Sequence, residues 1–171
     1  MTIENLPASE YNPYYATYTS KVPSGELLEV FQKSAVETAA YFDNIPADKH
    51  NYAYAEGKWT IKELLQHLID CERVFSYRAL WFARKNTTAL PGMDQDDFND
   101  HAHANERSMA DLIAEYRALK TATLTMLGSF SDEMFSQIGT ASGSEMSVRA
   151  LAFIMIGHEQ HHLWVLKERY L

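Results

Sequence analysis

Cysteine is almost absent from this sequence of 171 residues, and glycine and proline are scarce. The one thiol, Cys71, cannot form an internal disulfide, which suits a reducing cytoplasm. The chain has 7 glycines and 5 prolines, and no proline follows Pro91. Neither residue type occurs between Gly57 and Pro91 or between Gly92 and Gly128. Uninterrupted stretches of this length favour long helices over short strands.

Positive charge is also in deficit, because 15 lysines and arginines face 23 aspartates and glutamates and leave a net charge of −8. This balance repels phosphate backbones, and no Lys/Arg cluster overrides it locally, so we expect no nucleic-acid partner. The most apolar stretch, Leu151 to Ile156, is far too short to span a bilayer, so we expect no membrane partner. The first ten residues are polar, contain Pro7 and lack a signal-peptide pattern, which predicts a cytoplasmic location.

The sequence does contain enough apolar residues, 46% hydrophobic and 12% aromatic, for one domain covering residues 1–171. Four segments space their apolar residues three and four positions apart, as amphipathic helices do. Each predicted helix has roughly 20 residues or more and a length of about 30 Å. Four matched helices predict an all-α four-helix bundle with negligible sheet. The helices are preceded by N-cap signals at Ser24, the capping box Thr60–Glu63, Ser108 and Ser147.

Two connecting segments stand out. Residues 1–23 contain four tyrosines and are predicted to cross the bundle as an extended N-terminal arm. A long loop, residues 86–107, joins the second and third helices, and loops of this length are uncommon unless they are functional. The loop contains His101, His103 and several aspartates, but Phe98 occupies a ligand position of the EF-hand pattern and no glycine follows. We therefore expect a solvated acidic loop and no calcium site.

Histidines give the strongest indication of chemistry. His158 and His162 are four residues apart and share one helical face with apolar residues such as Leu151 and Leu166. An unpaired polar group costs about 1–3 kcal/mol to bury, and a divalent metal removes that cost because neutral imidazole is a common metal ligand. His67 on the second helix would complete the set, since metal sites in bundles are built from facing helices. The three histidines predict a metal site with coordination positions left open.

Other interpretations of the same residues stay open. One histidine of the pair could be a core residue bonded to a carbonyl group. Residues 158–162 also match H-E-x-x-H, with Glu159 as a weak general-base candidate, but the third ligand and the sheet of zinc proteases are missing. Cys71, four residues after His67, could form a Cys–His dyad, although a lone cysteine in an apolar stripe is more often inert packing.

Four motifs extend along most of the chain: Gly-Lys-Trp-Thr-Ile-Lys-Glu at 57–63, His-Leu-Ile-Asp at 67–70, Leu-Pro-Gly-Met-Asp-Gln-Asp at 90–96 and Gly-His-Glu-Gln-His-His at 157–162. The sequence thereby resembles the DinB-like (YfiT-like) superfamily of metal-binding four-helix bundles. The family's pattern of one plus two histidines falls on His67, His158 and His162, and His161 is not expected to coordinate. The resemblance implies Zn²⁺, Ni²⁺ or a similar ion in a pocket at one end of the bundle.

The resemblance leaves several functions open, because relatives include thiol-dependent S-transferases, a mycothiol-dependent isomerase and proteins named as metal-dependent hydrolases. No second carboxylate is clearly placed to act as a base. We therefore favour an enzyme in which the three-histidine metal activates a low-molecular-weight thiol for S-transfer to an electrophilic small molecule. The alternatives are a metal-dependent hydrolase and a non-catalytic, metal-stabilised stress-response module. We also expect a homodimer, as in relatives, with the aromatic arm packed across a partner.

Overall fold

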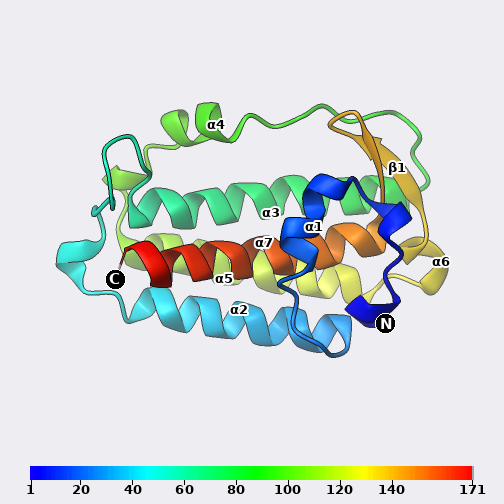
Figure 1. Ribbon diagram of the computed structural model, residues 1–171, viewed down its shortest axis with the longest axis horizontal. Coiled ribbons are helices and arrows are strands. Elements are labelled where there is room, and N and C mark those ends of the chain that lie inside the picture. Colours follow the sequence, from blue (N-terminus) through cyan, green and yellow to red (C-terminus); the bar gives the residue numbers. More distant parts are fainter. Residues whose placement is uncertain (171) are drawn as a thin grey trace.

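The computed structural model describes residues 1–170, and four long helices run side by side through it (Figure 1). α3 packs on α7 and α5, and α2 packs on the same two helices, so the four helices close into a bundle. The predicted all-α four-helix bundle is confirmed. The helices are α2 (Leu27–Asp43), α3 (Ile61–Ala83), α5 (Met109–Gly128) and α7 (Val148–Arg169).

Three of the four helices begin at the predicted caps. At α3 the Thr60 hydroxyl accepts a hydrogen bond from the Glu63 N–H at 3.2 Å, and the Glu63 carboxylate accepts one from the Thr60 N–H at 2.6 Å. Each side chain thereby satisfies a backbone donor that the first helical turn leaves unpaired. The hydroxyls of Ser108 and Ser147 cap α5 and α7 by accepting from backbone N–H groups three residues on.

The predicted cap of the first helix is wrong. α2 begins two residues later than that cap implies, with Glu26 at the N-cap position and no side-chain cap. Ser24 instead donates a hydrogen bond to the Glu4 carboxylate at 2.6 Å, so its hydroxyl fastens the N-terminal arm. Serine forms both kinds of contact readily, and the sequence pattern does not distinguish them.

Short elements fill the arm and the long loop, where only irregular chain was expected. The arm folds into three single 3₁₀ turns followed by α1 (Ala16–Thr19), which packs on α7. The long loop contains α4 (Gln95–Ala102), and the Asp94 carboxylate caps it by accepting from the N–H groups of Asp96 and Asp97. The loop acids therefore start a helix. The remaining short helices are η1 (Ile3–Asn5), η2 (Ala8–Glu10), η3 (Pro13–Tyr15), η4 (Ala47–Lys49), η5 (Ala104–Glu106) and α6 (Asp132–Phe135).

A small antiparallel hairpin, β1 (Ile138–Ala141) with β2 (Ser144–Ser147), precedes α7 and was not expected from the sequence. Its turn places Ser142 and Gly143 at positive φ, where glycine is favoured. Gly139 lets β1 lie directly on α3, because a Cβ at that position would stand 2.0 Å from the Phe82 ring. The hairpin thus closes one end of the bundle.

The core consists of two apolar clusters separated by a polar layer. One cluster lies toward the hairpin and includes Phe31, Phe82 and Phe153, and the other lies toward the opposite end and includes Phe42 and Leu112. Between them each long helix contributes buried polar or charged residues. These are Ser34 and Thr38 from α2, His67 and Glu72 from α3, Lys120 and Thr123 from α5, and His158 and Glu159 from α7.

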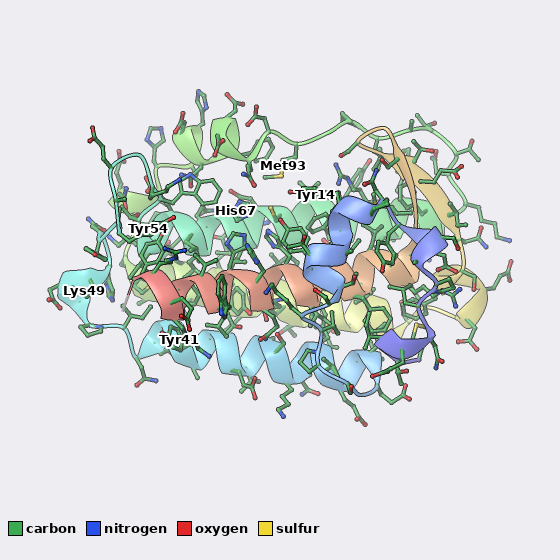
Figure 2. All side chains as sticks on the ribbon, in the orientation of Figure 1. Tyr14, Tyr41, Lys49, Tyr54, His67 and Met93 are labelled. Atoms are coloured by element: carbon green, nitrogen blue, oxygen red, sulfur yellow. The ribbon has the colours of Figure 1, made fainter. Side chains whose placement is uncertain are left out.

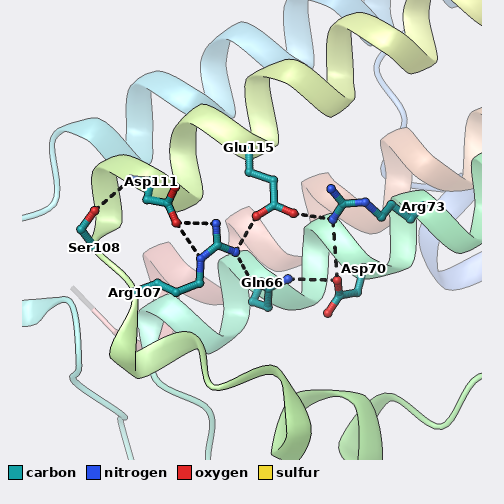
Figure 3. Close-up of polar contacts among 7 residues, drawn as sticks. All are labelled: Gln66, Asp70, Arg73, Arg107, Ser108, Asp111 and Glu115. Atoms are coloured by element: carbon teal, nitrogen blue, oxygen red, sulfur yellow. Dashed lines mark hydrogen bonds and ion pairs between the residues drawn. The ribbon is translucent and has the colours of Figure 1, made fainter.

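Outside the core, an ion cluster joins α3 to α5 (Figure 3). The Glu115 carboxylate pairs with Arg73 and Arg107, each at 2.5 Å. Arg107 also donates to the Gln66 side-chain oxygen at 2.8 Å, and Gln66 donates to Asp70 at 2.9 Å. These contacts tie α3 to α5 and to the chain that leads into it. Within residues 1–170, no helix is long and apolar enough to cross a bilayer.

Candidate metal centre

Three histidine rings meet in the polar layer. His67 comes from α3 (Figure 2). His158 and His162 come from successive turns of α7. The Nε2 atom of His158 lies 3.1 Å from the Nε2 atoms of both His67 and His162. The structure therefore places both other predicted ligands beside His158, but the described side chains whose ligand atoms all lie within 4.8 Å of one another are His67, Cys71 and His158, without His162. The position of the histidines between the two apolar clusters corrects the expectation of a site at one end of the bundle.

Protons alone do not satisfy these three nitrogens. A neutral Nε2 atom either donates one hydrogen or accepts one, so His158 can pair with only one neighbour. Burial lowers the pKa of His67 to about 4, and burial together with the neighbouring rings holds the pKa values of His158 and His162 well below the ordinary value. The rings are therefore neutral, as metal ligands must be.

The spacing also suits a metal. Imidazole nitrogens bound at about 2.0–2.1 Å to a tetrahedral Zn²⁺ are roughly 3.3 Å apart. The observed 3.1 Å separations of His158 from His67 and His162 are close to that value. These two separations therefore suit imidazoles that share one divalent ion, with His158 central to the set.

Aromatic side chains surround the histidines. The Trp59 ring lies 4.6 Å from the His67 ring, measured between centroids, and so covers it from the chain that leads into α3. The Tyr18 and Phe75 rings meet the His158 ring edge-to-face, with centroids 5.2 and 6.0 Å from its centroid. These rings pack against the imidazoles and restrict their orientation.

Cys71 lies at the margin of the cluster. Its Sγ, with ligand atoms of His67 and His158, belongs to a metal-capable group whose atoms all lie within 4.8 Å of one another. The sulfur is 3.6 Å from Nδ1 and 3.7 Å from Nε2 of His67, so it sits beside the ring and away from the direction in which Nε2 would bind an ion. Burial raises the pKa of the Cys71 thiol to about 12. Both observations favour a packing role for a neutral Cys71 thiol over a reactive Cys–His dyad.

The Glu159 carboxylate is fully engaged. One oxygen accepts from Ser34 at 2.5 Å and Thr38 at 3.1 Å. The other accepts from Tyr116 at 2.6 Å and pairs with Lys120 at 2.5 Å. The weak general-base candidate thus sits in a network directed toward α2 and α5, with both oxygens already bonded.

Lys120 is the centre of this network and pairs with Glu72 as well, at 2.5 Å. Burial alone would lower the pKa of Lys120, but the carboxylates of Glu159 and Glu72 outweigh it and raise the pKa. Glu72, Lys120, Glu159 and His158 line a cavity of about 10 Å³. The charged network therefore lies directly beside the histidines. This network was not predicted from the sequence, although Lys120 falls on the apolar stripe of its helix, four residues after Tyr116.

A pocket of about 140 Å³ adjoins the histidine cluster, and we call it the tyrosine pocket. It is lined by His158 and Cys71, by Arg78, and by Tyr14, Tyr15 and Tyr18 of the arm, among others. Tyr14 is 67% exposed, so the pocket reaches the surface. Tyr14 and Met93 both line it, and both lie beside α3 in Figure 2. These tyrosines were predicted to belong to the arm, with no role at the site.

The remaining histidines lie apart from the cluster. His101 and His103 are exposed on the α4 segment, and the His101 ring contacts the carbonyl of Asp97 at 2.8 Å. His161 packs edge-on against Tyr18, with ring centroids 5.5 Å apart. The fourth, His50, contacts the carbonyl of Ile45 at 3.0 Å through its Nε2 atom.

Comparison with known proteins agrees with this architecture. A family scan matches the DinB superfamily over residues 31–166, which is more than half of the chain. The chain belongs to the DinB superfamily. A search of curated proteins found no match.

Three solved structures share the fold at low sequence identity. YfiT from Bacillus subtilis superposes with a TM-score of 0.75 and 14% identity, covering 83% of this chain and 82% of YfiT. YfiT is described as a probable metal-dependent hydrolase with an unusual four-helix bundle topology. The DinB-like protein YjoA from Bacillus subtilis superposes with a TM-score of 0.60 and 19% identity, covering 84% of this chain and 87% of YjoA. The mycothiol-dependent maleylpyruvate isomerase superposes with a TM-score of 0.66 and 13% identity, covering 99% of this chain and 63% of the isomerase. This chain thus spans less than two thirds of that isomerase.

Proposed function

We propose that this DinB-superfamily protein is a metal-dependent enzyme that transfers a low-molecular-weight thiol to a small electrophile. His67, His158 and His162 would hold one divalent transition metal, Zn²⁺ or Ni²⁺. The observation that supports the proposal is the position of His158, whose Nε2 lies 3.1 Å from the Nε2 atoms of His67 and His162, beside a pocket that reaches the surface. An open three-histidine site of this kind leaves room for a reactant.

A metal held there would supply Lewis acidity, which would favour loss of the proton from a bound thiol to solvent. In the transfer itself the sulfur would form a bond to the electrophilic carbon as the leaving group departs with its electron pair. The chain's own contribution is to position the reactants. Tyr18 and Phe75 fix His158 by edge contacts, and the tyrosine pocket admits a small molecule on that side.

Thiol transfer is preferred to hydrolysis because the tyrosine pocket offers no base. Among the described residues that line it there is no aspartate or glutamate. Glu159, the nearest acid in sequence, is bonded by Ser34, Thr38, Tyr116 and Lys120. A hydrolase ordinarily places a group that takes a proton from the attacking water. The name of YfiT keeps metal-dependent hydrolysis as the second candidate.

The test couples metal analysis to a turnover screen. Purified protein is analysed for bound metal and then assayed with small thiols plus electrophiles, and separately with esters, amides and lactones. Thiol-dependent turnover that is lost in His158→Ala and kept in His101→Ala supports the proposal. Thiol-independent turnover of an ester, amide or lactone would establish the hydrolase instead. A bound metal without turnover in any panel would indicate a non-catalytic module.

A further inference from the structure

Arg78 is the one buried arginine among residues 1–170, with 4% of its surface exposed, and it lines the tyrosine pocket. We propose that Arg78 is a carboxylate-binding residue, and that the small molecule that enters the tyrosine pocket is an organic anion with an apolar or aromatic body. The inference deepens the proposed function and rests on it for the reaction, because it names the chemical class of the ligand. The binding of a carboxylate by Arg78 does not itself need a metal.

The charge of Arg78 has no counterion within the part of the chain that the structure describes. No aspartate or glutamate of residues 1–170 forms an ion pair with it, whereas the buried Lys120 has two carboxylate partners. A charge taken out of water is costly unless it is paired. Burial lowers the pKa of Arg78, although arginine stays protonated in proteins. An anionic ligand would supply the missing partner.

The hydrogen bonds of Arg78 leave part of its guanidinium free. Nη2 donates to the carbonyl oxygen of Pro91 at 2.8 Å and to the hydroxyl of Ser142 at 2.9 Å. The Tyr15 hydroxyl also lies close enough to interact with the guanidinium, but Nε and Nη1 make no hydrogen bond of ordinary length and angle within residues 1–170. The two fixed contacts orient the group, and the free N–H groups match the two oxygens of a carboxylate.

The other walls of the pocket describe the rest of the ligand. Tyr14, Tyr15 and Phe75 offer aromatic surface, and the pocket of about 140 Å³ has room for a small molecule only. His158 lies on the same pocket, so a ligand anchored at Arg78 would extend toward the candidate metal centre. Apolar walls with a few placed polar groups are typical of small-molecule sites.

The experiment titrates benzoate and its neutral isostere benzamide into chelator-treated protein and into zinc-loaded protein, using calorimetry. We expect benzoate to bind at least tenfold more tightly than benzamide in both forms, since a hydrogen-bonded charge pair is worth one to two orders of magnitude in affinity. Arg78→Gln should abolish the preference, Arg78→Lys should restore part of it, and the exposed Arg169→Gln should leave it unchanged. Equal affinity for the two probes, or an intact preference in Arg78→Gln, would overturn the proposal.

A second measurement covers the case in which Arg78→Gln does not fold, because Arg78 also holds residues 91 and 142 together. In wild-type protein with ¹⁵N-labelled arginine, benzoate should shift one Nε–H resonance saturably while benzamide leaves it in place. No shift of any arginine resonance would contradict the proposal. The two proposals can be contradicted independently. A protein that binds no metal but prefers benzoate would contradict the proposed function and support the Arg78 site. A protein with thiol-transfer activity but no preference for benzoate would contradict the Arg78 site alone.

Discussion

The backbone of α1 lies so close to α7 that a Cβ added to Gly157 would stand 2.1 Å from the carbonyl oxygen of Tyr18. Glycine at this position allows the arm to cover His158, the next residue, with the Tyr18 ring. The absence of a side chain at one residue therefore builds one wall of the tyrosine pocket.

Replacing Gly157 with alanine tests this relationship. Alanine gains up to about 1 kcal/mol of helix propensity, but the clash is with a backbone atom and forces the arm to move. Overpacking of this kind costs about 1–3 kcal/mol, so we expect a net loss of stability in urea denaturation and faster proteolysis within residues 1–23. Gly92→Ala is the control, because its Cβ would meet only the Ser142 hydroxyl at 3.7 Å. A Gly157→Ala protein as stable and as protease-resistant as wild type would show that the arm does not depend on this contact.

The metal centre predicts a dependence on three specific rings. His67→Ala, His158→Ala and His162→Ala should each lower zinc affinity by more than about a hundredfold, because each removes a ligand from a site that has only three. Equilibrium dialysis followed by elemental analysis measures the effect. His101→Ala, exposed on α4, and His161→Ala should keep full zinc content. Full metal affinity in His67→Ala would rule out the three-histidine site.

Lys120 should be among the most sensitive positions for stability. Its replacement by methionine leaves Glu72 and Glu159 buried without their shared cation, and breaking a buried pair costs about 3–5 kcal/mol. Chemical denaturation of the metal-free protein isolates this effect from metal binding. The control is Lys33→Met, whose exposed side chain lies 3.9 Å from Glu37 and should change stability by less than about 1 kcal/mol. Equal effects of the two substitutions would mean that the network is not stabilising.

Glu115 predicts a pH-dependent contribution to stability. Burial alone would raise its pKa, but hydrogen bonds and ion pairs with Arg107 and Arg73 outweigh burial and lower it from 4.5. A lowered folded-state pKa stabilises the protein above the unfolded value, and this stabilisation is lost as the pH falls through the folded value.

Wild type should therefore exceed Glu115→Gln in stability by roughly 1 kcal/mol at pH 7, and the difference should shrink below about pH 4.5. Urea midpoints at pH 7, 5 and 4 measure it. Glu37→Gln, in an exposed pair on α2, should show little difference at any of these pH values. A gap between wild type and Glu115→Gln that does not change with pH would mean that the ion cluster of Figure 3 does not act through the charge of Glu115.

The helices and the histidine set could be predicted because both depend on local spacing. The capping box at Thr60, the breaker-free stretches and the spacing of His158 and His162 need no tertiary information. The hairpin could not be predicted, since its strands have four residues each and β1 depends on the close approach of Gly139 to Phe82. Strands this short carry little periodic signal.

The charged network and Arg78 escaped prediction for a different reason. Lys120 and Glu72 are 48 positions apart in the sequence, and the pairing that makes their burial tolerable exists only after α3 and α5 pack together. Arg78 lies on α3 between apolar residues of the helix. Its proposed role follows from its burial without a carboxylate partner. Such a property is visible only in the packed structure.

The polar layer between the two apolar clusters also fixes the alignment of the helices. A shift of α5 along its axis by one turn, about 5.4 Å, would withdraw Lys120 from Glu72 and Glu159 and leave three unpaired charges in the interior. Purely apolar helices could slide past one another at much lower cost. The same shift would remove the Tyr116 hydroxyl from Glu159, the residue next to His158. The axial register of the helices and the placement of the histidines are therefore coupled. A bundle packed in the wrong register would bury unpaired charges and also displace the histidines.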